Sequence, residues 1–355
     1  MRVLFLAGRE TEYARNQVLL AALQRIAEVD VVASEHKPRS LLTNSILLAA
    51  RAAPLLLRKQ YDLVFVGFYG HLIMRLIAPL VRCPLLFDAF ISTYDTLCFD
   101  RRRYAPDSLV GRAAFALDRS ATHQADRVLL DTESHIDYFV STFGLPRASL
   151  CAVPVGCSDS IFRPTPLPEP GGTVEVLYYA SFLPLHGIDV ILEAAARLQD
   201  EPIRLRLIGN GPNLTAMKAL AANLALDNVR FDQPISQSEL AAAIAASDLC
   251  LGGHFYAGGK AGRVVPGKIY QMLAVGRPVI AADAPGNREL LTHDTTAFFV
   301  PPSDPEALAA AIRELAHDTA RRQTLANGGR SLYHERCSEA VITRQIQKIT
   351  AGLVE

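Results

Sequence analysis

The chain has 355 residues, half of them hydrophobic, which is enough apolar material to fill the cores of two domains. Its 36 Lys and Arg residues balance its 36 Asp and Glu residues, so no overall charge would recruit nucleic acid. Six cysteines without a C-x-x-C pair favour free thiols in a cytoplasmic protein over disulfides or zinc ligands. No run of about 18 uninterrupted apolar residues is present, so we expect no membrane-spanning helix.

In the first half of the chain, short apolar runs alternate with helical patterns, which predicts a parallel, doubly wound α/β sheet. The runs are VLFLAG at the start of the chain, then VDVVAS, LVFVGF, PLLFDAF and RVLLDT. Gly8 ends the first run, but no G-x-G-x-x-G pattern follows it, which argues against a dinucleotide-binding dehydrogenase. We expect this first domain to span residues 1–165, and its first run to be a strand rather than an export signal.

A strongly apolar and basic segment lies between the second and third expected strands, at residues 40–59. Lys37 and Arg39 precede it, and Arg51, Arg58 and Lys59 lie within it. Such a segment can lie on an anionic membrane surface. The alternative is a helix buried between the sheet and a neighbour, which we favour because Pro54 interrupts the amphipathic pattern.

Polar residues gather where the third and fourth expected strands end. His71 closes the GFYGH turn, Asp88 lies at the end of PLLFDAF, and Asp95 follows in ISTYDTLCFD. In open parallel sheets ligands bind beyond the carboxyl ends of the strands, so these residues are candidates for a ligand site. The alternative for each is a structural role, because such residues commonly cap helices and stabilise loops.

A Pro- and Gly-rich segment from Thr165 to Gly172 indicates a linker, and the alternation of strands and helices then starts again. The expected strands are VEVLYYA, RLRLIG, VRF, LCLGG and PVIAAD. We therefore expect a second doubly wound domain over residues 166–337 and a final helix over residues 338–355.

The stretch 263–291 carries the clearest local signals. A proline suits the helix start and Gly276 is a stop signal, so we expect a helix from Pro266 to Val275. Lys268 and Gln271 share one face of this helix. A lysine at a helix start beyond the ends of parallel strands suits an anion such as a diphosphate, although solvated lysines are also common there.

Four motifs, in this order, resemble the family-4 retaining glycosyltransferases, which belong to glycosyl transferases group 1. They are ADRVLLD, the turn LIGNGP, the passage AASDLCLGG and the segment PGKIYQMLAVGRPVI. The resemblance covers about residues 126–315 and implies the GT-B fold, in which two Rossmann-like, doubly wound domains face a central cleft. It also implies that the final helix crosses back onto the first domain.

The chain departs from this family at three positions. Many members carry two glutamates eight positions apart, where this chain has Arg263 and Gln271. His186 stands where members have a lysine. We expect catalytic roles for Arg263, Lys268 and Asp88, and no metal ligands. The expected donor-binding residues are His186, Gly187, Gly209, Gly211, Lys260, Val264, Val265 and Gln271. The expected acceptor-side residues are Gly8, His71 and Asp95.

The resemblance implies a retaining glycosyltransferase of the hexosyltransferase type, which moves a sugar from a nucleotide-diphosphate donor to a glycan, lipid-linked or small-molecule acceptor. It would act without a metal or other cofactor in polysaccharide biosynthesis, in the cytoplasm or at the inner face of the membrane. Two alternatives remain open because both glutamates are absent. One is a binding protein for nucleotide sugars or glycans that turns nothing over, and the other is a nucleotide-sugar epimerase on the same fold.

Overall fold

The computed structural model describes residues 1–35 and 40–354, and it divides into two compact units. The first unit contains Met1–Ser158 and Cys337–Glu355, and the second contains Asp159–Arg336. The boundary therefore lies at Ser158 rather than after residue 165. Arg277 explains the difference, because its buried guanidinium donates to the carbonyl oxygen of Thr165 at 3.0 Å and so ties the start of the expected linker to the second unit.

The first unit contains a six-stranded parallel sheet in the order β2-β1-β3-β4-β5-β6. Val3 lies opposite Val29 on one side and Leu63 on the other, and both neighbours run parallel to β1. The order reverses between β1 and β3, which is the switch point where open sheets of this kind bind ligands. The strands are β1 (Arg2–Ala7), β2 (Glu28–Ala33), β3 (Leu63–Val66), β4 (Leu85–Asp88), β5 (Arg127–Leu130) and β6 (Leu150–Ala152).

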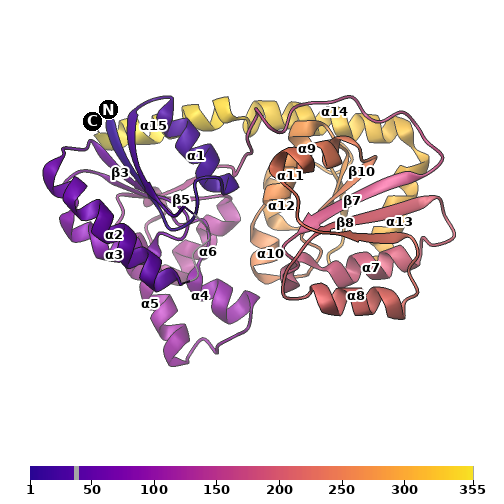
Figure 1. The fold of residues 1–355 in the computed structure, drawn as a ribbon, viewed down its shortest axis with the longest axis horizontal. Helices are drawn as coiled ribbons and strands as arrows, with labels where there is room; N and C mark the ends of the chain where they lie inside the picture. The colour runs from indigo at the N-terminus through magenta and orange to yellow at the C-terminus, as the bar shows by residue number, and fades with distance from the viewer. Residues whose placement is uncertain (36–39, 355) are drawn as a thin grey trace. The chain divides into compact units, whose positions relative to one another are not determined.

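Helices cover both faces of this sheet (Figure 1). Val3 and Phe5 of β1 pack with α1 and α15, while the intervening Leu4 and Leu6 pack with α2, α3 and α6. Successive side chains of a strand point to opposite faces, and both faces are covered, which is why the buried strands of this sheet are mostly apolar. The helices are α1 (Ala14–Gln24), α2 (Leu41–Arg58), α3 (His71–Ile77), α4 (Thr93–Asp95), α5 (Leu109–His123), α6 (Glu133–Phe143) and α15 (Glu339–Val354), with short turns η1 (Ala78–Leu80), η2 (Thr96–Asp100) and η3 (Arg147–Ser149).

The end of the chain belongs to the first unit. Ile342 and Ile346 of α15 are fully buried in the same core cluster as Val18 and Leu19 of α1. Arg25, which follows α1, forms an ion pair with Glu339 at the start of α15. This packing joins two segments that are more than 300 residues apart.

The second unit contains another six-stranded parallel sheet, in the order β12-β11-β10-β7-β8-β9. Its order reverses between β7 and β10, so a second switch point lies there. The strands are β7 (Val174–Ala180), β8 (Ile203–Gly209), β9 (Val229–Asp232), β10 (Leu249–Gly253), β11 (Val279–Ala282) and β12 (Phe298–Val300). The helices are η4 (Pro184–His186), α7 (Ile188–Ala196), α8 (Leu214–Asn223), α9 (Gln237–Ala245), α10 (Gly259–Arg263), α11 (Gly267–Val275), α12 (Pro285–Leu290), α13 (Pro305–His317) and α14 (Thr319–Arg336).

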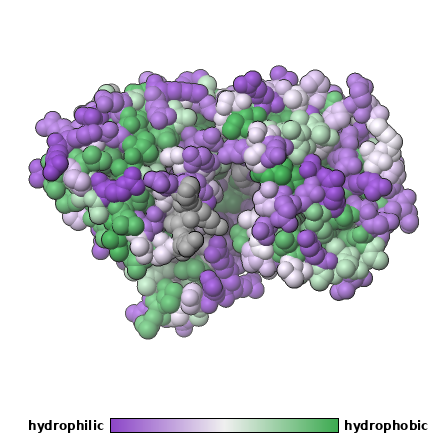
Figure 2. Space-filling model, viewed as in Figure 1, coloured by the Kyte–Doolittle hydropathy of each residue, from purple (hydrophilic) through white to green (hydrophobic). Residues whose placement is uncertain are grey.

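Helix α2 is exposed, so the predicted burial of residues 40–59 is wrong. The helix continues through Pro54, and only 17% of it is buried. Leu42, Ile46, Leu47 and Leu57 are each exposed by half or more, and we call these four residues the apolar face of α2. Figure 2 shows hydrophobic surface over this helix.

Among the described residues, α2 is the one helix that passes a test of length and composition for crossing a membrane. Its inner side, however, packs into the core of the first unit through Leu48 and Ala52. Lys37 and Arg39, which precede the segment, lie outside the described residues.

Candidate functional site

Lys268 lies at the carboxyl-end edge of the second sheet, on the first turn of α11. This helix begins at Gly267, with Pro266 as its capping residue, and ends at Val275 before Gly276, as expected. The side chain of Lys268 is buried rather than solvent-facing. Its ammonium group donates to the hydroxyl of Tyr178 at 3.0 Å and lies 4.1 Å from the centre of that ring.

Burial lowers the pKa of Lys268 to about 7. The charged ammonium is therefore held in a site that stabilises it poorly, and an anionic ligand beside it would favour the charged form. Tyr178 lies on β7, and the β7 and β10 strands flank the switch point of this sheet. Lys268 is thus placed where an anion would bind.

His186 ends the η4 turn that precedes α7. The backbone N–H of Leu183 donates to its Nδ1 atom at 3.1 Å, so in the neutral ring the proton is on Nε2. Burial, together with Lys268 and Lys260, lowers the pKa of His186 to about 2. His186 therefore offers a neutral N–H donor. It does not supply the positive charge expected from the lysine that family members have at this position.

Gly187 follows His186 and permits a close approach of the loop after β10. A Cβ atom at Gly187 would lie 2.8 Å from the carbonyl carbon of Phe255, so any larger residue would push this loop away. The backbone N–H of Phe255 also donates to the carbonyl oxygen of His186 at 3.4 Å. The η4 turn and the β10 loop are thus held together.

His254 is a site residue that the sequence analysis missed. It follows β10 directly, and its ring stacks on that of His186 with centroids 5.2 Å apart and planes 18° apart. Burial, then His186 and the two lysines, lower the pKa of His254 well below its usual value. A histidine just beyond the carboxyl end of a strand was the signal that could have identified it.

These four side chains form one group, which we call the basic cluster: Lys260, Lys268, His186 and His254. The two lysines act electrostatically on both imidazoles, so all four share one neighbourhood. Concentrated positive charge and N–H donors at this edge of a sheet suit a phosphate or diphosphate. Among residues 1–35 and 40–354, no group of three or more His, Cys, Asp or Glu side chains could hold a metal ion.

Gly209 and Gly211 form the turn after β8, and both have left-handed backbone conformations. A Cβ atom at Gly209 would lie 1.9 Å from the carbonyl oxygen of Ala180, and one at Gly211 would lie 2.0 Å from that of Ser181. The two glycines are thus required for the ends of β7 and β8 to approach each other. Their predicted contact with the donor stays a prediction.

Gln271 lies one turn after Lys268 on α11. The hydroxyl of Tyr179 donates to its Oε1 atom at 2.7 Å and also contacts the carbonyl oxygen of Lys268 at 3.2 Å. The side-chain oxygen of Gln271 is thus engaged with Tyr179, while its NH₂ group is a donor that a ligand could use.

Three further predicted site residues, one catalytic and two donor-binding, lie on α10 or just after it. Arg263 is half-buried at the end of α10, whereas Val264 and Val265 have buried side chains. Any ligand contact of the two valines would therefore come from their backbone.

Asp88, which the sequence predicts to be catalytic, is a buried carboxylate in the first unit that forms an ion pair with Arg15. Both Asp88 and Arg15 are fully buried, and the guanidinium of Arg15 donates to Oδ1 of Asp88 at 2.8 Å and 3.1 Å and to Oδ2 at 3.2 Å. Burial raises the pKa of Asp88, and Arg15 opposes this shift. Arg15 also donates to the carbonyl oxygens of Val153 and Pro154 at 2.7 and 2.9 Å, so this ion pair joins the ends of the strands.

The predicted acceptor-side residues are also buried. His71 lies 3.6 Å from the Asp118 carboxylate, and burial lowers its pKa. Asp95 is 2% exposed, and its backbone N–H donates to Ser92 at 2.9 Å. Gly8 links the strand ends, because its backbone N–H donates to the carbonyl oxygen of Phe68 at 3.1 Å. These three residues support the loops of the first unit, and their predicted contacts with the acceptor stay predictions.

Half-buried aromatic and basic side chains line the same edge of the first sheet. The Arg9 guanidinium lies 4.8 Å from the ring centre of Tyr13 and 5.8 Å from that of Tyr69. Tyr69 has a positive φ of 61°, which is strained for a residue with a side chain. Sequence analysis missed this rim because it singled out His71 in the GFYGH turn.

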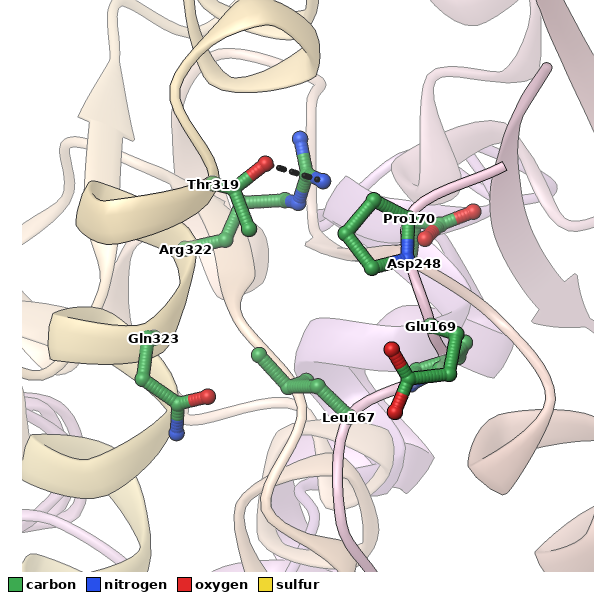
Figure 3. A pocket seen from close by; sticks show the side chains of 8 residues that line it. Leu167, Glu169, Pro170, Asp248, Thr319, Arg322 and Gln323 are labelled. Atoms are coloured by element: carbon green, nitrogen blue, oxygen red, sulfur yellow. Dashed lines mark hydrogen bonds between the residues drawn. The ribbon is translucent and has the colours of Figure 1, made fainter. Parts of the chain in front are cut away.

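One surface pocket of the second unit contains none of the predicted site residues (Figure 3). Its lining includes Leu167, Asp248 and Arg322. Arg322 donates to the carbonyl oxygens of Leu315 and Ala316 at 2.7 Å each, which caps the end of α13. Arg322 thus serves the fold.

A comparison with protein families matches residues 161–332 to the family described as glycosyl transferases group 1. This segment lies entirely within the second unit and contains the whole basic cluster.

Two curated relatives illustrate the similarity. The chain is 30% identical over 217 residues to D-inositol 3-phosphate glycosyltransferase of Streptomyces avermitilis, which covers 55% of this chain and 45% of the relative. It is 29% identical over 206 residues to the GDP-mannose-dependent alpha-(1-6)-phosphatidylinositol monomannoside mannosyltransferase of Mycobacterium tuberculosis, which covers 54% of this chain and 53% of the relative. The matched regions thus span about half the length of these relatives.

Solved structures match over the whole chain. Anabaena HepE in complex with UDP and glucose has a TM-score of 0.75 at 18% identity, and 99% of this chain and 100% of that chain are covered. Sucrose-phosphate synthase from Thermosynechococcus elongatus has a TM-score of 0.78 at 18% identity, with 99% of each chain covered. At this identity the likeness concerns the fold, and it confirms the predicted GT-B class of two Rossmann-like α/β units.

Proposed function

We propose that this chain is a retaining glycosyltransferase that uses a nucleotide-diphosphate sugar. The match of residues 161–332 to glycosyl transferases group 1 supports this proposal. The observation that carries this proposal is the basic cluster beyond the carboxyl ends of β7 and β10. A departing nucleoside diphosphate develops negative charge, and preorganised cations and N–H donors stabilise it. The second unit would hold the donor and the first unit the acceptor.

Three residues of the cluster, and Gln271 beside it, have parts in this proposal. Lys268 and Lys260 supply positive charge to the diphosphate, while His186 supplies a neutral hydrogen bond from Nε2. Gln271 meets the nucleoside through its NH₂ group. The enzyme thereby stabilises the leaving group and positions the acceptor hydroxyl, with no metal ion or other cofactor required.

The acceptor proposal changes with the structure. Asp88, Asp95 and His71 are buried, whereas the rim of Arg9, Tyr13 and Tyr69 is partly exposed. Aromatic faces beside a guanidinium suit the apolar face and hydroxyl groups of a sugar. We therefore assign acceptor contacts to this rim, with a glycan or lipid-linked sugar as the acceptor.

A titration of UDP, GDP and ADP by calorimetry, followed by incubation with the matching nucleotide sugars and product analysis, tests the function. Binding followed by release of the nucleoside diphosphate, in the presence of EDTA, supports a metal-independent transferase. Binding without turnover supports the non-catalytic alternative, and conversion of the sugar to its epimer supports an epimerase. If none of the three diphosphates binds, the proposal is wrong.

The apolar face of α2 supports a further part of the proposal, which is peripheral contact with the inner face of the membrane. Arg51 and Arg58 are exposed on the same helix, and no acidic residue lies between Glu35 and Asp62. Exposed leucines flanked by arginines suit an anionic bilayer surface, with the charges at the headgroups and the leucines beneath them.

Sedimentation with phosphatidylcholine vesicles, with and without phosphatidylglycerol, tests this contact. We expect binding to the anionic vesicles only, and loss of binding in an Ile46→Glu, Leu57→Glu double variant that keeps its diphosphate affinity. Val354→Glu changes an exposed apolar residue of α15 and is the matched control. Dimerisation through α2 without vesicle binding would instead indicate that a second copy covers this face.

A further inference from the structure

The imidazole of His254 has an unusual position in the basic cluster. It is only 8% exposed, and its Nδ1 atom has no hydrogen-bond partner among the described residues. Buried polar atoms in native proteins are nearly always paired, because burial removes the water that would otherwise solvate them. The Nδ1 atom of His254 therefore indicates a missing partner, which a bound ligand can supply.

The surroundings of His254 define the charge of that ligand. His186 stacks on the ring, and Lys260 and Lys268 both act on it electrostatically. These groups come from η4, α10 and α11, so positive charge and N–H donors reach His254 from three elements. An anionic oxygen is the partner that this environment favours.

The topology indicates which part of a donor would reach this position. In the sheet, β7 lies between β8 and β10. If the nucleoside meets the turn after β8, which holds Gly209 and Gly211, the phosphates extend across β7 towards the loop after β10. His254 then lies nearest to the second phosphate, the one that carries the sugar.

We propose that Nδ1–H of His254 donates a hydrogen bond to an oxygen of the distal phosphate of the donor. This inference rests on the proposed function, since it assigns one contact of the same diphosphate. His254 would be a ligand-binding residue of the transfer reaction. Its partner would be an oxygen of the phosphate from which the sugar is transferred.

The neighbouring structure holds the ring in place for this role. His186 supports one face of the His254 imidazole, and Asn287 approaches the carbonyl oxygen of the preceding Gly253 at 3.5 Å. The loop cannot move away freely, because Phe255 is tied to His186 through its backbone. A ring fixed in this way contributes a hydrogen bond without a further loss of side-chain freedom.

Calorimetric titration of the whole chain with UDP, GDP and ADP, and with UMP, GMP and AMP, tests the proposal. His254→Ala should weaken the preferred diphosphate by about tenfold or more and the matching monophosphate by less than about twofold, because only the diphosphate carries the distal phosphate. His254→Asn should restore most of the affinity, since its amide lies near the position of Nδ1, and His254→Gln should not. His317→Ala, at the exposed end of α13, is the matched control.

The outcomes separate this inference from the proposed function. Wild-type protein that binds none of the diphosphates would contradict both. Wild-type binding that is unchanged in His254→Ala, or an equal loss for the diphosphate and the monophosphate, would overturn the role of His254 alone. If His254→Ala fails to fold, as judged by thermal unfolding, the comparison of Asn with Gln decides. Equal diphosphate affinity in the Asn and Gln variants would then count against a hydrogen bond from Nδ1 of His254.

Discussion

The ammonium group of Lys268 donates to the hydroxyl of Tyr178 at 3.0 Å, inside a part of the second unit where both side chains are buried. The two residues are 90 positions apart, and they connect α11 to β7 at the switch point of the sheet. A buried lysine with a tyrosine as its hydrogen-bond partner is poorly stabilised in the absence of an anion. We infer that this charge is retained for binding, at a cost in stability.

Replacement of Lys268 by methionine tests this inference. Met keeps the apolar stem and removes the ammonium, so we expect a loss of roughly 10- to 100-fold in affinity for the preferred nucleoside diphosphate, the equivalent of a charged hydrogen bond. The melting temperature should stay the same or rise, because a desolvated charge is removed. Lys348→Met, at an exposed position of α15, is the control. Unchanged affinity in Lys268→Met would rule out the donor site proposed here.

The lowered pKa of Lys268, about 7, predicts how stability depends on pH. Between pH 7 and about 10, unfolded chains keep this lysine protonated while the folded protein releases the proton, so the unfolded state binds more protons. Stability should therefore rise as pH increases above 7, by up to about 1.4 kcal/mol per pH unit.

Urea unfolding of wild type and Lys268→Met at about pH 7 and about pH 8.5 isolates this contribution. Over this range the folded protein releases the Lys268 proton while the unfolded chain keeps it. The difference in unfolding free energy between the two proteins should change with pH, since the other titrating groups are common to both. A constant difference across this range would show that Lys268 has an ordinary pKa.

Asp88→Asn should destabilise the first unit, because it leaves the Arg15 guanidinium buried without its carboxylate. Breaking a buried ion pair in this way costs about 3 to 5 kcal/mol. Urea unfolding measures the loss, and Asp107→Asn at an exposed position provides the matched control. Protein that remains folded should keep its diphosphate affinity. A stable Asp88→Asn variant that binds donor but lacks turnover would instead restore the catalytic role predicted from the sequence.

Arg263→Glu should weaken donor binding, although it places the family's more common residue at this position. Arg263 lies at the end of α10, three residues after Lys260 of the basic cluster, and a carboxylate there would repel a diphosphate. We expect kcat/KM with the matched donor to fall by about tenfold or more. An equal or higher kcat/KM in Arg263→Glu would show that the arginine marks a decayed site, and would favour the non-catalytic alternative.

The arrangement of strands and helices could be predicted because it depends on local patterns. Apolar runs of strand length alternate with helical patterns in both halves, and the apolar runs form the strands of two parallel sheets. The helix of Lys268 ends at Gly276, because a left-handed residue there needs no side chain. These features are determined by residues that are close together in the sequence.

Burial and pairing were decided by the tertiary structure. Asp88 looks like a cleft carboxylate in the sequence, but Arg15, 73 residues earlier, buries it in an ion pair. Residues 40–59 look like a core helix, but no neighbour covers the apolar face of α2 in the described structure. His186 stands in a lysine position, but burial, together with Lys268 and Lys260, keeps it neutral. Each of these outcomes depends on partners that are distant in the sequence, and the desolvation they impose on a charge has no local signature.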